Sequence, residues 1–243
     1  MTVLVVGASG ATGRLLVKQL LLRGKKVKVV VRSLDNLPAF FLDDAEVSII
    51  HASLLELGDD EMVQLVDGCE AIASCLGHQL SWKGIFGQPR RLVTEATRRL
   101  CAAAKRCEPL APVKFVLMNT AGNRNRDLNE SVSVAQQMAV GLIRLLLPPH
   151  ADNEQAADYL REVIGQNNSA IEWVAVRPDG LVDREEVSEY EVYPSPTRSA
   201  IFNAGATSRI NVGHFMAELI SNDALWTQWR GKMPVIYNKE AEA

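Results

Sequence analysis

Three glycines near the start of the chain, Gly7, Gly10 and Gly13, lie between an apolar segment and an amphipathic one. The apolar segment, residues 3–6, is a continuous hydrophobic run, which is typical of a parallel strand buried on both faces. In such a turn the first glycine allows the tight bend, the second lets a pyrophosphate approach the backbone, and the third lets the helix pack on the strand. The N-terminus of that helix attracts a phosphate. The pattern therefore predicts a dinucleotide-binding turn.

The next strand follows at the spacing that such a unit requires. The helix after the glycines carries leucines on one face and ends near Gly24, and residues 27–31 form the second strand. A protein that selects NAD places Asp or Glu after this strand, where the carboxylate accepts hydrogen bonds from the ribose 2′-hydroxyl. This chain has Arg32 and Ser33 there, which suit a 2′-phosphate. We therefore predict NADP as the cofactor, ahead of NAD.

Two other interpretations of this strand end stay open. Arg32 could be a solvated residue that closes the strand, and Asp35 keeps NAD possible. Arg14, in the first turn of the helix, is a candidate second cation for the phosphate.

Length and composition indicate one α/β domain that spans residues 1–243. A formal net charge of −3 gives no reason to expect binding to nucleic acid or to an anionic membrane. The chain enters a strand at once, and no apolar run approaches the roughly 18 residues of a membrane span, so we expect a cytoplasmic protein. The cysteines form no Cys-x-x-Cys pair and the histidines are scattered, which predicts reduced thiols and no metal site.

Strands and helices alternate along the chain, which predicts a doubly wound parallel sheet, the Rossmann fold, with helices on both faces. Further strands are expected at residues 46–51, 71–76, 113–118, 171–176 and 234–237. Helices are expected at residues 59–66, 89–106, 133–147 and 153–164, and another opens near Val212. Residues 181–211 lack this regularity and are expected to form a small irregular C-terminal lobe on the substrate side.

Four motifs carry a resemblance to a known superfamily. They are the glycine turn at residues 5–14, Val-Val-Val-Arg-Ser at 29–33, Asn-Thr-Ala at 119–121 and Val-Arg-Pro-Asp-Gly-Leu at 176–181. Together they resemble the atypical short-chain dehydrogenases/reductases, which include NmrA-like proteins and the biliverdin-IXβ and flavin reductases. The resemblance covers most of the chain and is weakest at residues 123–150 and 182–203. It implies a nicotinamide dinucleotide that lies across the carboxyl ends of the strands.

The resemblance also implies which positions contact the cofactor. Ser53 stands where the family has Asp, so this chain departs from the pattern at the adenine. The implied contacts are Ser9, Gly10, Ala11 and Thr12 for the pyrophosphate, Ser53 and Leu54 for the adenine, Leu76 and Gly77 for the adenosine side, and Asn119, Thr120 and Pro178 for the nicotinamide end.

The chain departs from the superfamily most clearly at the catalytic residues. Many of these enzymes use a Tyr-x-x-x-Lys pair, in which lysine lowers the pKa of the tyrosine hydroxyl for proton transfer. This chain has no such pair, and Tyr159, followed four residues later by Val163, is expected to pack through its ring. Thr120 takes the place of the family's substrate-polarising hydroxyl, although it could merely close a core strand. A flavin- or quinone-like acceptor can take its proton from water, so a reductase stays possible.

Other polar groups follow the predicted strand ends. His78, after Gly77, could face a substrate or bond to backbone, and with Thr120 it is our candidate for catalysis. His150 could be a substitute acid. The loop at residues 79–87 suits a pocket wall or an edge packed on the core. A basic stripe on the helix before residue 106 is interpreted as a solvated face; it comprises Arg90, Arg91, Arg98, Arg99, Lys105 and Arg106.

Residues 181–199 leave a strand end directly, and we predict that they form a lid that selects the substrate. A surface excursion with an acidic hairpin is the alternative. Arg198 could anchor an anionic acceptor or pair with a nearby glutamate.

Two functions are compatible with these features. The one we favour is an NADPH-dependent reductase that transfers hydride to a small aromatic or conjugated acceptor, flavin- or quinone-like. The other is a regulatory protein that binds NADP as a redox sensor without catalysis, as some NmrA-like proteins are understood to do. The expected partner is a small molecule. The sequence leaves open the identity of the substrate and whether the protein is a monomer or a homodimer.

Overall fold

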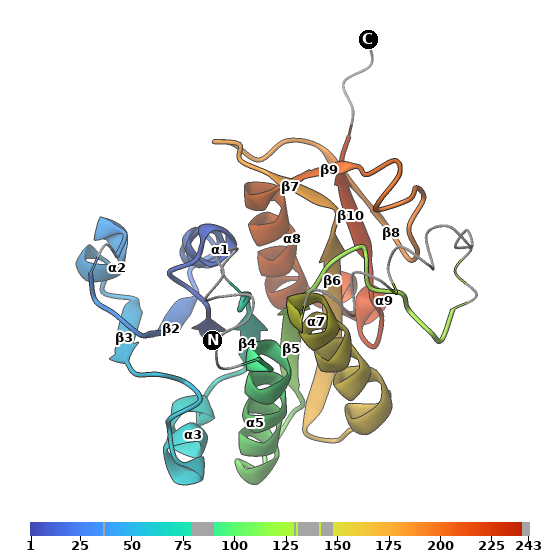
Figure 1. The fold of residues 1–243 in the computed structure, drawn as a ribbon. Coiled ribbons are helices and arrows are strands. Elements are labelled where there is room, and N and C mark those ends of the chain that lie inside the picture. The colour runs from blue at the N-terminus through green and yellow to red at the C-terminus, as the bar shows by residue number, and fades with distance from the viewer. Residues whose placement is uncertain (36, 79–89, 129, 131–140, 142–147, 240–243) are drawn as a thin grey trace.

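A mostly parallel sheet runs through the middle of the molecule (Figure 1). The computed structural model of the chain describes residues 1–35, 37–78, 90–128, 130, 141 and 148–239. Within these residues the sheet has eight strands, which are β1 (Thr2–Val6), β2 (Lys26–Val31), β3 (Val47–His51), β4 (Ala71–Ser74), β5 (Val113–Met118), β6 (Ile171–Pro178), β8 (Tyr190–Tyr193) and β10 (Val235–Asn238). Their order is β3-β2-β1-β4-β5-β6-β10-β8, and β8 runs antiparallel to β10.

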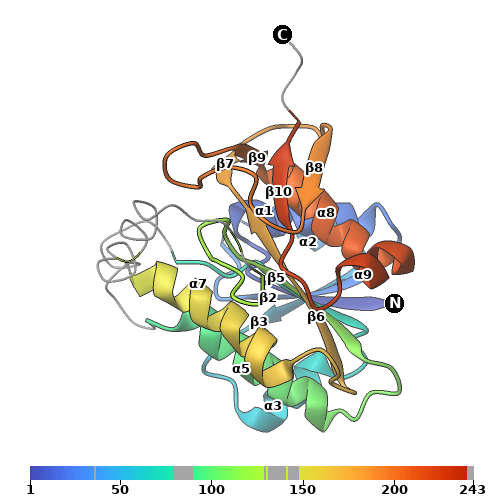
Figure 2. The ribbon, with the colours of Figure 1, turned by 90° about the vertical axis from the view of Figure 1, so that its right-hand side faces the viewer.

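Helices cover both faces of the sheet, as Figure 2 shows from the side. In β1, Leu4 and Val6 pack into the core on one face, whereas Val3 and Val5 pack into the core on the other. This explains why the strand is apolar at every position rather than at alternate ones. The first face carries α3 (Asp59–Val66), α5 (Leu92–Arg106) and α7 (Pro148–Asp158), and the second carries α1 (Ala11–Leu21), α2 (Ala39–Asp43), α8 (Arg209–Ser221) and α9 (Asp223–Trp229).

Helices α1 and α8 pack closely on the second face. A side chain at Gly213 of α8 would lie 2.9 Å from the backbone nitrogen of Leu16 in α1, so the glycine permits this approach. Because α1 follows the glycine turn, the contact also holds the turn at the carboxyl end of β1.

The doubly wound parallel sheet that the sequence predicts is confirmed, with differences at two helices. Helix α5 begins at Leu92, and the predicted start at Pro89 lies outside the described residues. Helix α7 begins at Pro148 instead of Asn153, because a proline fits the first turn of a helix, where its missing N–H is not needed. It continues into a π-helical turn, Tyr159–Ile164. Most of the predicted helix at 133–147 lies outside the described residues.

The C-terminal segment is more regular than expected. Strands β7 (Gly180–Val182) and β9 (Ala206–Ser208) form a small parallel sheet, and β8 extends the main sheet beside β10. The expected lobe at residues 181–211 therefore contributes an edge strand to the main sheet. Among the helices that the structure describes, none is both long and apolar enough to cross a membrane.

Candidate functional site

The glycine turn after β1 has a backbone that admits no side chain at two positions. Gly7 has φ +75°, and a Cβ there would lie 2.6 Å from the carbonyl carbon and oxygen of Cys75. A Cβ at Gly13 would collide with the carbonyl oxygen of Gly7. Between them, the N–H of Gly10 donates to that same oxygen over 3.1 Å and closes the turn. The chain therefore needs glycine at Gly7 and Gly13 on steric grounds.

The turn presents the N-terminus of α1 to the carboxyl edge of the sheet. Gly10 is the N-cap and supplies no side-chain hydrogen bond, and the first turn contains no acidic residue. The N–H groups of this turn and the positive end of the helix dipole therefore suit an anion such as a pyrophosphate. Ala11 and Arg14 are exposed here and Thr12 is buried.

A cavity of about 510 Å³ opens beside this turn, at the carboxyl ends of β1, β2, β3 and β4. Its lining joins four segments that are far apart in the sequence, at residues 6–10, 30–32, 52–56 and 75–77, together with Leu92. A dinucleotide site at this edge requires such a convergence of strand ends. The predicted cofactor residues in the lining are Gly7, Ser9, Gly10, Arg32, Ser53, Leu54, Leu76 and Gly77. The buried Cys75 also lines it, and burial raises the pKa of its thiol to about 12, so it is a neutral wall residue.

Arg32 is the charged residue that follows β2 in this lining. It is exposed, and its carbonyl oxygen lies 3.2 Å from Nε2 of His51. Ser33 and Asp35 form a separate exposed turn, in which the Ser33 hydroxyl donates to the Asp35 carboxylate over 2.9 Å and accepts from its N–H. A cation, and not a carboxylate, therefore borders the cavity at the position that distinguishes the two cofactors.

Asn119, Thr120 and Pro178 lie at the ends of β5 and β6, outside this cavity lining. The N–H of Asn123 donates to the carbonyl of Thr120 over 3.0 Å and closes a turn, and the N–H of Gly122 donates to Oγ1 of Thr120 over 3.3 Å. Because Oγ1 acts as an acceptor in this contact, its own proton can be directed toward a ligand.

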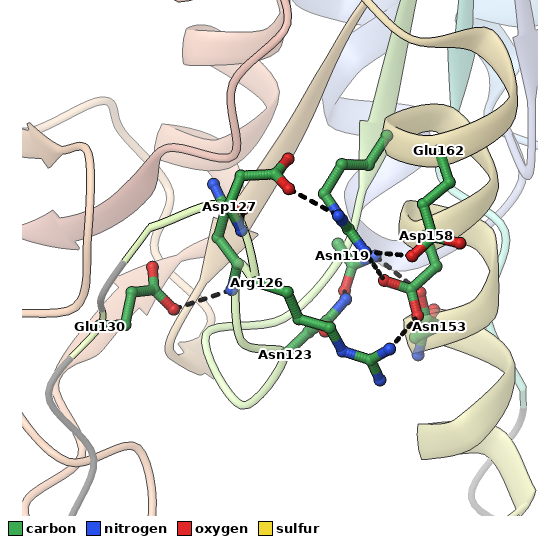
Figure 3. Close-up of polar contacts among 10 residues, drawn as sticks. Asn119, Asn123, Arg126, Asp127, Glu130, Asn153, Asp158 and Glu162 are labelled. Carbon is green, nitrogen blue, oxygen red and sulfur yellow. Dashed lines mark hydrogen bonds and ion pairs between the residues drawn. The ribbon is translucent and has the colours of Figure 1, made fainter.

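Side-chain contacts fasten the segment 119–127 to α7 and the turn after it, as Figure 3 shows. The Asn119 side chain donates to the Asn153 carbonyl over 2.9 Å, Arg126 pairs with Asp158 at 3.3 Å, and Asp127 pairs with Arg161 at 2.6 Å. The end of β5 therefore rests on a side-chain network, which sequence periodicity does not reveal.

His78 follows the cavity residue Gly77, and its ring is turned toward α7. Its Nε2 lies 2.8 Å from the carboxylate of Asp152, and the His78 side chain is only 5% exposed. The loop predicted as a pocket wall, residues 79–87, lies outside the described residues.

Asp152 is a site residue that the sequence analysis missed. Its buried carboxylate accepts the N–H groups of Val93 and Thr94 over 2.8 and 2.9 Å, at the first turn of α5. The N-cap residue of α5, Arg91, supplies no side-chain hydrogen bond, so the helix is capped by a residue from another helix. The missing local cap before Leu92 is the signal that could have indicated such a partner.

Two further candidates for acid chemistry differ in their placement. The ring of Tyr159 lies under the guanidinium of Arg98 at 5.9 Å, and burial raises the pKa of its hydroxyl, which opposes use as a base. His150 lies 3.6 Å from Glu154, and its Cε1 would be 3.3 Å from a Cβ at Gly122. The structure therefore brings His150 next to the turn that carries Thr120.

Arg99, predicted on a solvated face, and Arg198, predicted to anchor an anionic acceptor or to pair with a glutamate, both make specific contacts. Arg99 of the basic stripe donates to the carbonyls of Leu55 and Leu57, and its side chain is 18% exposed, so this part of the stripe is not a free solvated face. Since Leu55 lines the cavity, Arg99 supports the loop that follows β3. The guanidinium of Arg198 lies 5.6 Å over the ring of Tyr237.

Comparisons with known sequences agree with this geometry. Residues 7–223 match a protein family described as NAD(P)H-binding. An uncharacterized chloroplastic protein of Arabidopsis thaliana is 28% identical over 198 residues, which cover 80% of this chain and 64% of that protein. The chain thus spans less than two thirds of the length of this curated relative.

Solved structures share the fold. A wide-type short-chain dehydrogenase/reductase from Veillonella parvula, in complex with NADP, matches with a TM-score of 0.69 at 17% identity, over 100% of this chain and 96% of that one. The anaerobillin reductase ChuY from Escherichia coli O157:H7 matches with a TM-score of 0.68 at 15% identity, over the whole of both chains. With a glycine turn that fits a pyrophosphate and a family match over residues 7–223, the chain belongs to the NAD(P)H-binding family, as its resemblance to the short-chain dehydrogenase/reductase superfamily predicted.

Proposed function

We propose that this protein is an NADPH-dependent oxidoreductase that transfers hydride to a small aromatic or conjugated acceptor, flavin- or quinone-like. The observation that carries the proposal is the cavity beside the glycine turn, which joins the ends of β1, β2, β3 and β4 in one nucleotide-sized space. The likeness in fold to a dehydrogenase/reductase in complex with NADP and to an anaerobillin reductase supports it.

The preference for NADPH rests on Arg32. A guanidinium at the cavity border can donate two parallel charge-assisted hydrogen bonds to the 2′-phosphate of NADPH. The neutral 2′-hydroxyl of NADH cannot accept such a pair. Asp35, the residue that could favour NADH, already holds the Ser33 hydroxyl in its own exposed turn. Arg14 on α1 is a second exposed cation near the phosphate end of the site.

The chemistry needs few groups from the protein. A bound nicotinamide supplies the hydride, and the chain must orient the acceptor and polarise the atom that gains negative charge. The hydroxyl of Thr120 is our candidate for this polarisation. The N–H of Gly122 donates to its oxygen, which supports the proposal because the proton of the hydroxyl is then available for an acceptor. The raised pKa of Tyr159 and the lack of a lysine four residues later disfavour an alcohol dehydrogenase, which needs a tuned base.

A second candidate function follows from the lack of a Tyr-x-x-x-Lys pair. A protein that binds NADP without catalysis needs the glycine turn and Arg32 but no acid or base. Such a sensor would bind the oxidised and reduced cofactors with different consequences for a partner and would consume neither.

Steady-state oxidation of NADPH by the purified protein, with free flavin or a quinone as acceptor, tests the proposal. Thr120→Val removes the hydroxyl at nearly constant shape and is expected to lower kcat roughly tenfold or more, with NADPH affinity unchanged. Thr227→Val is the matched control, since Thr227 bonds a backbone carbonyl within α9. If the protein binds NADPH tightly but reduces neither flavins nor quinones, the result would favour the sensor.

A further inference from the structure

Arg177, the penultimate residue of β6, is fully buried with its charge. In the sequence it stands within the Arg-Pro-Asp-Gly motif. All five of its N–H donors have acceptors at hydrogen-bond distance. Nε donates to the Met233 carbonyl at 2.7 Å, Nη1 to the Asn123 carbonyl at 2.9 Å and to Glu130 at 3.2 Å, and Nη2 to Glu130 at 2.8 Å and to the Pro194 carbonyl at 3.1 Å.

Glu130 completes the charge balance. Its side chain is 3% exposed, and its two carboxylate oxygens face the two Nη atoms of Arg177 in a bidentate pair. One of these oxygens also accepts the N–H of Asn125 over 2.8 Å. A pair so fully desolvated need not add stability, since an apolar pair of similar volume often serves as well. The role of the ion pair therefore follows from the groups that its geometry holds in place and not from its contribution to the free energy of unfolding.

The contact to Asn123 leads directly to Thr120. Asn123 offers its carbonyl to Arg177, while its N–H closes the turn on the carbonyl of Thr120. The Asn119 side chain accepts from the N–H of Thr120 at 2.8 Å and from the Asn123 side chain at 3.3 Å. Moving the Asn123 carbonyl would therefore shift the turn that sets the direction of the Thr120 hydroxyl.

The contact to Pro194 ties Arg177 to a second segment. Pro194 follows β8, inside the segment predicted to select the substrate. One guanidinium thus spans the turn after β5 and the segment that returns from β8.

We propose that Arg177 is a positioning residue for Thr120, which holds the 120–123 turn through the Asn123 carbonyl and fixes its distance from the segment at Pro194. This inference rests on the proposed function for its catalytic meaning. Arg177 itself is buried and does not contact the substrate, so its effect on the reaction passes through the turn.

Hydrogen exchange tests the positioning without any need for activity. Arg177→Lys keeps the buried charge but replaces five fixed donors by one ammonium, which cannot span four acceptor groups. The N–H groups of Gly122 and Asn123 are expected to exchange roughly tenfold faster, while those of β1 and β4 keep their rates. Arg230→Lys, at the Glu172 ion pair, is the matched control and should leave the turn unchanged. Equal acceleration throughout the sheet would overturn the proposal, because it would indicate only global destabilisation.

Kinetics then test the link to catalysis. Arg177→Lys is expected to lower kcat roughly tenfold with NADPH affinity unchanged. In a protein that already carries Thr120→Val, it is expected to lower kcat by less than about twofold more. Independent, multiplicative losses would overturn the link, as would an equal loss in Arg230→Lys. If Arg177→Lys does not fold, Glu130→Gln, which keeps the shape of the side chain, replaces it in both experiments with the same expectations. A wild-type protein without turnover would defeat the proposed function alone, since hydrogen exchange still decides the positioning.

Discussion

The carboxylate of Asp152 lies 2.8 Å from Nε2 of His78 and joins two elements that meet at the edge of the proposed site. It also accepts two backbone N–H groups at the start of α5, so one side chain holds both the segment after β4 and the beginning of a helix. The next residue, Asn153, accepts from Asn119 at the end of β5. The first turns of α7 therefore set the relative positions of the β4 and β5 ends.

Replacing Asp152 by alanine tests this role. The change leaves the N–H groups of Val93 and Thr94 buried without an acceptor, and each unsatisfied donor costs about 1–3 kcal/mol. We expect a loss of at least that size in the free energy of unfolding, measured by urea denaturation. Asn222→Ala, which removes an exposed N-cap from α9, should cost only about 1 kcal/mol. Similar losses in the two variants would show that Asp152 is no more than an ordinary cap.

The fold was predictable where its determinants are local. The Gly7 and Gly13 positions are required by backbone contacts within one turn, and the apolar run of β1 reflects burial on both faces. The edge strand β8 was missed because its partner, β10, lies more than forty residues away and because an acidic stretch precedes it and Pro194 follows it. The start of α7 was misplaced because the predicted helix at 153–164 began only after Pro148 and Pro149, whereas proline also suits a first helical turn.

The candidate site was likewise predictable only where its residues follow directly from a local sequence pattern. Arg32 could be placed because it directly follows a strand whose neighbour is the glycine turn. Asp152 and Arg177 could not, because their acceptors and donors come from segments brought together only by the tertiary fold. Buried polar side chains that serve distant backbone groups leave no periodic pattern in a sequence.

Arg32→Asp is expected to change the choice of cofactor. Loss of the guanidinium removes charge-assisted bonds to the 2′-phosphate, worth about 1.5–3 kcal/mol, and the new carboxylate repels it. The Kd for NADPH should rise by roughly 10- to 100-fold while that for NADH changes little, as fluorescence titration would measure. Lys26→Asp, at the other end of β2, makes the same change in net charge at an exposed position. If both variants weakened NADPH equally, or if Arg32→Asp weakened NADH as much, Arg32 would not select the cofactor.

His214 is expected to make stability depend on pH. Burial, and then the charge of Arg23, lower its pKa from 6.5, while Glu218 opposes this; its Nδ1 also lies 2.8 Å from the Tyr190 hydroxyl. The folded protein therefore binds fewer protons at this site than the unfolded chain, and the stability it contributes is present above about pH 6.5 and is lost as pH falls. His214→Asn should lose less stability than the wild type on acidification from about pH 7.5 to about pH 5. Parallel curves in urea titrations would refute the assignment.

The segment that selects the acceptor is expected to be shorter than the sequence suggested. Residues 190–193 belong to β8, and the Ser188 N–H donates to Asn211, so replacing either would disturb the sheet or α8. Residues 183–187 are exposed, and among them Asp183 makes an ion pair with Arg209 at 2.9 Å. A glycine-serine segment of equal length in place of 183–187 should therefore test the lid without removing β8.

This replacement should raise the KM for the acceptor roughly tenfold, which corresponds to about 1.4 kcal/mol, and leave NADPH affinity within about twofold. The reason is the separation of contacts, because the cavity for the nucleotide is built from the ends of β1, β2, β3 and β4 and contains no residue after Leu92. The same replacement at residues 108–111, where the fully exposed Leu110 lies between α5 and β5, controls for added chain flexibility. An unchanged KM would exclude the segment from acceptor recognition. The acceptor would then be expected against the turn at residues 120–123, held by Arg177 and closed by the carbonyl of Thr120.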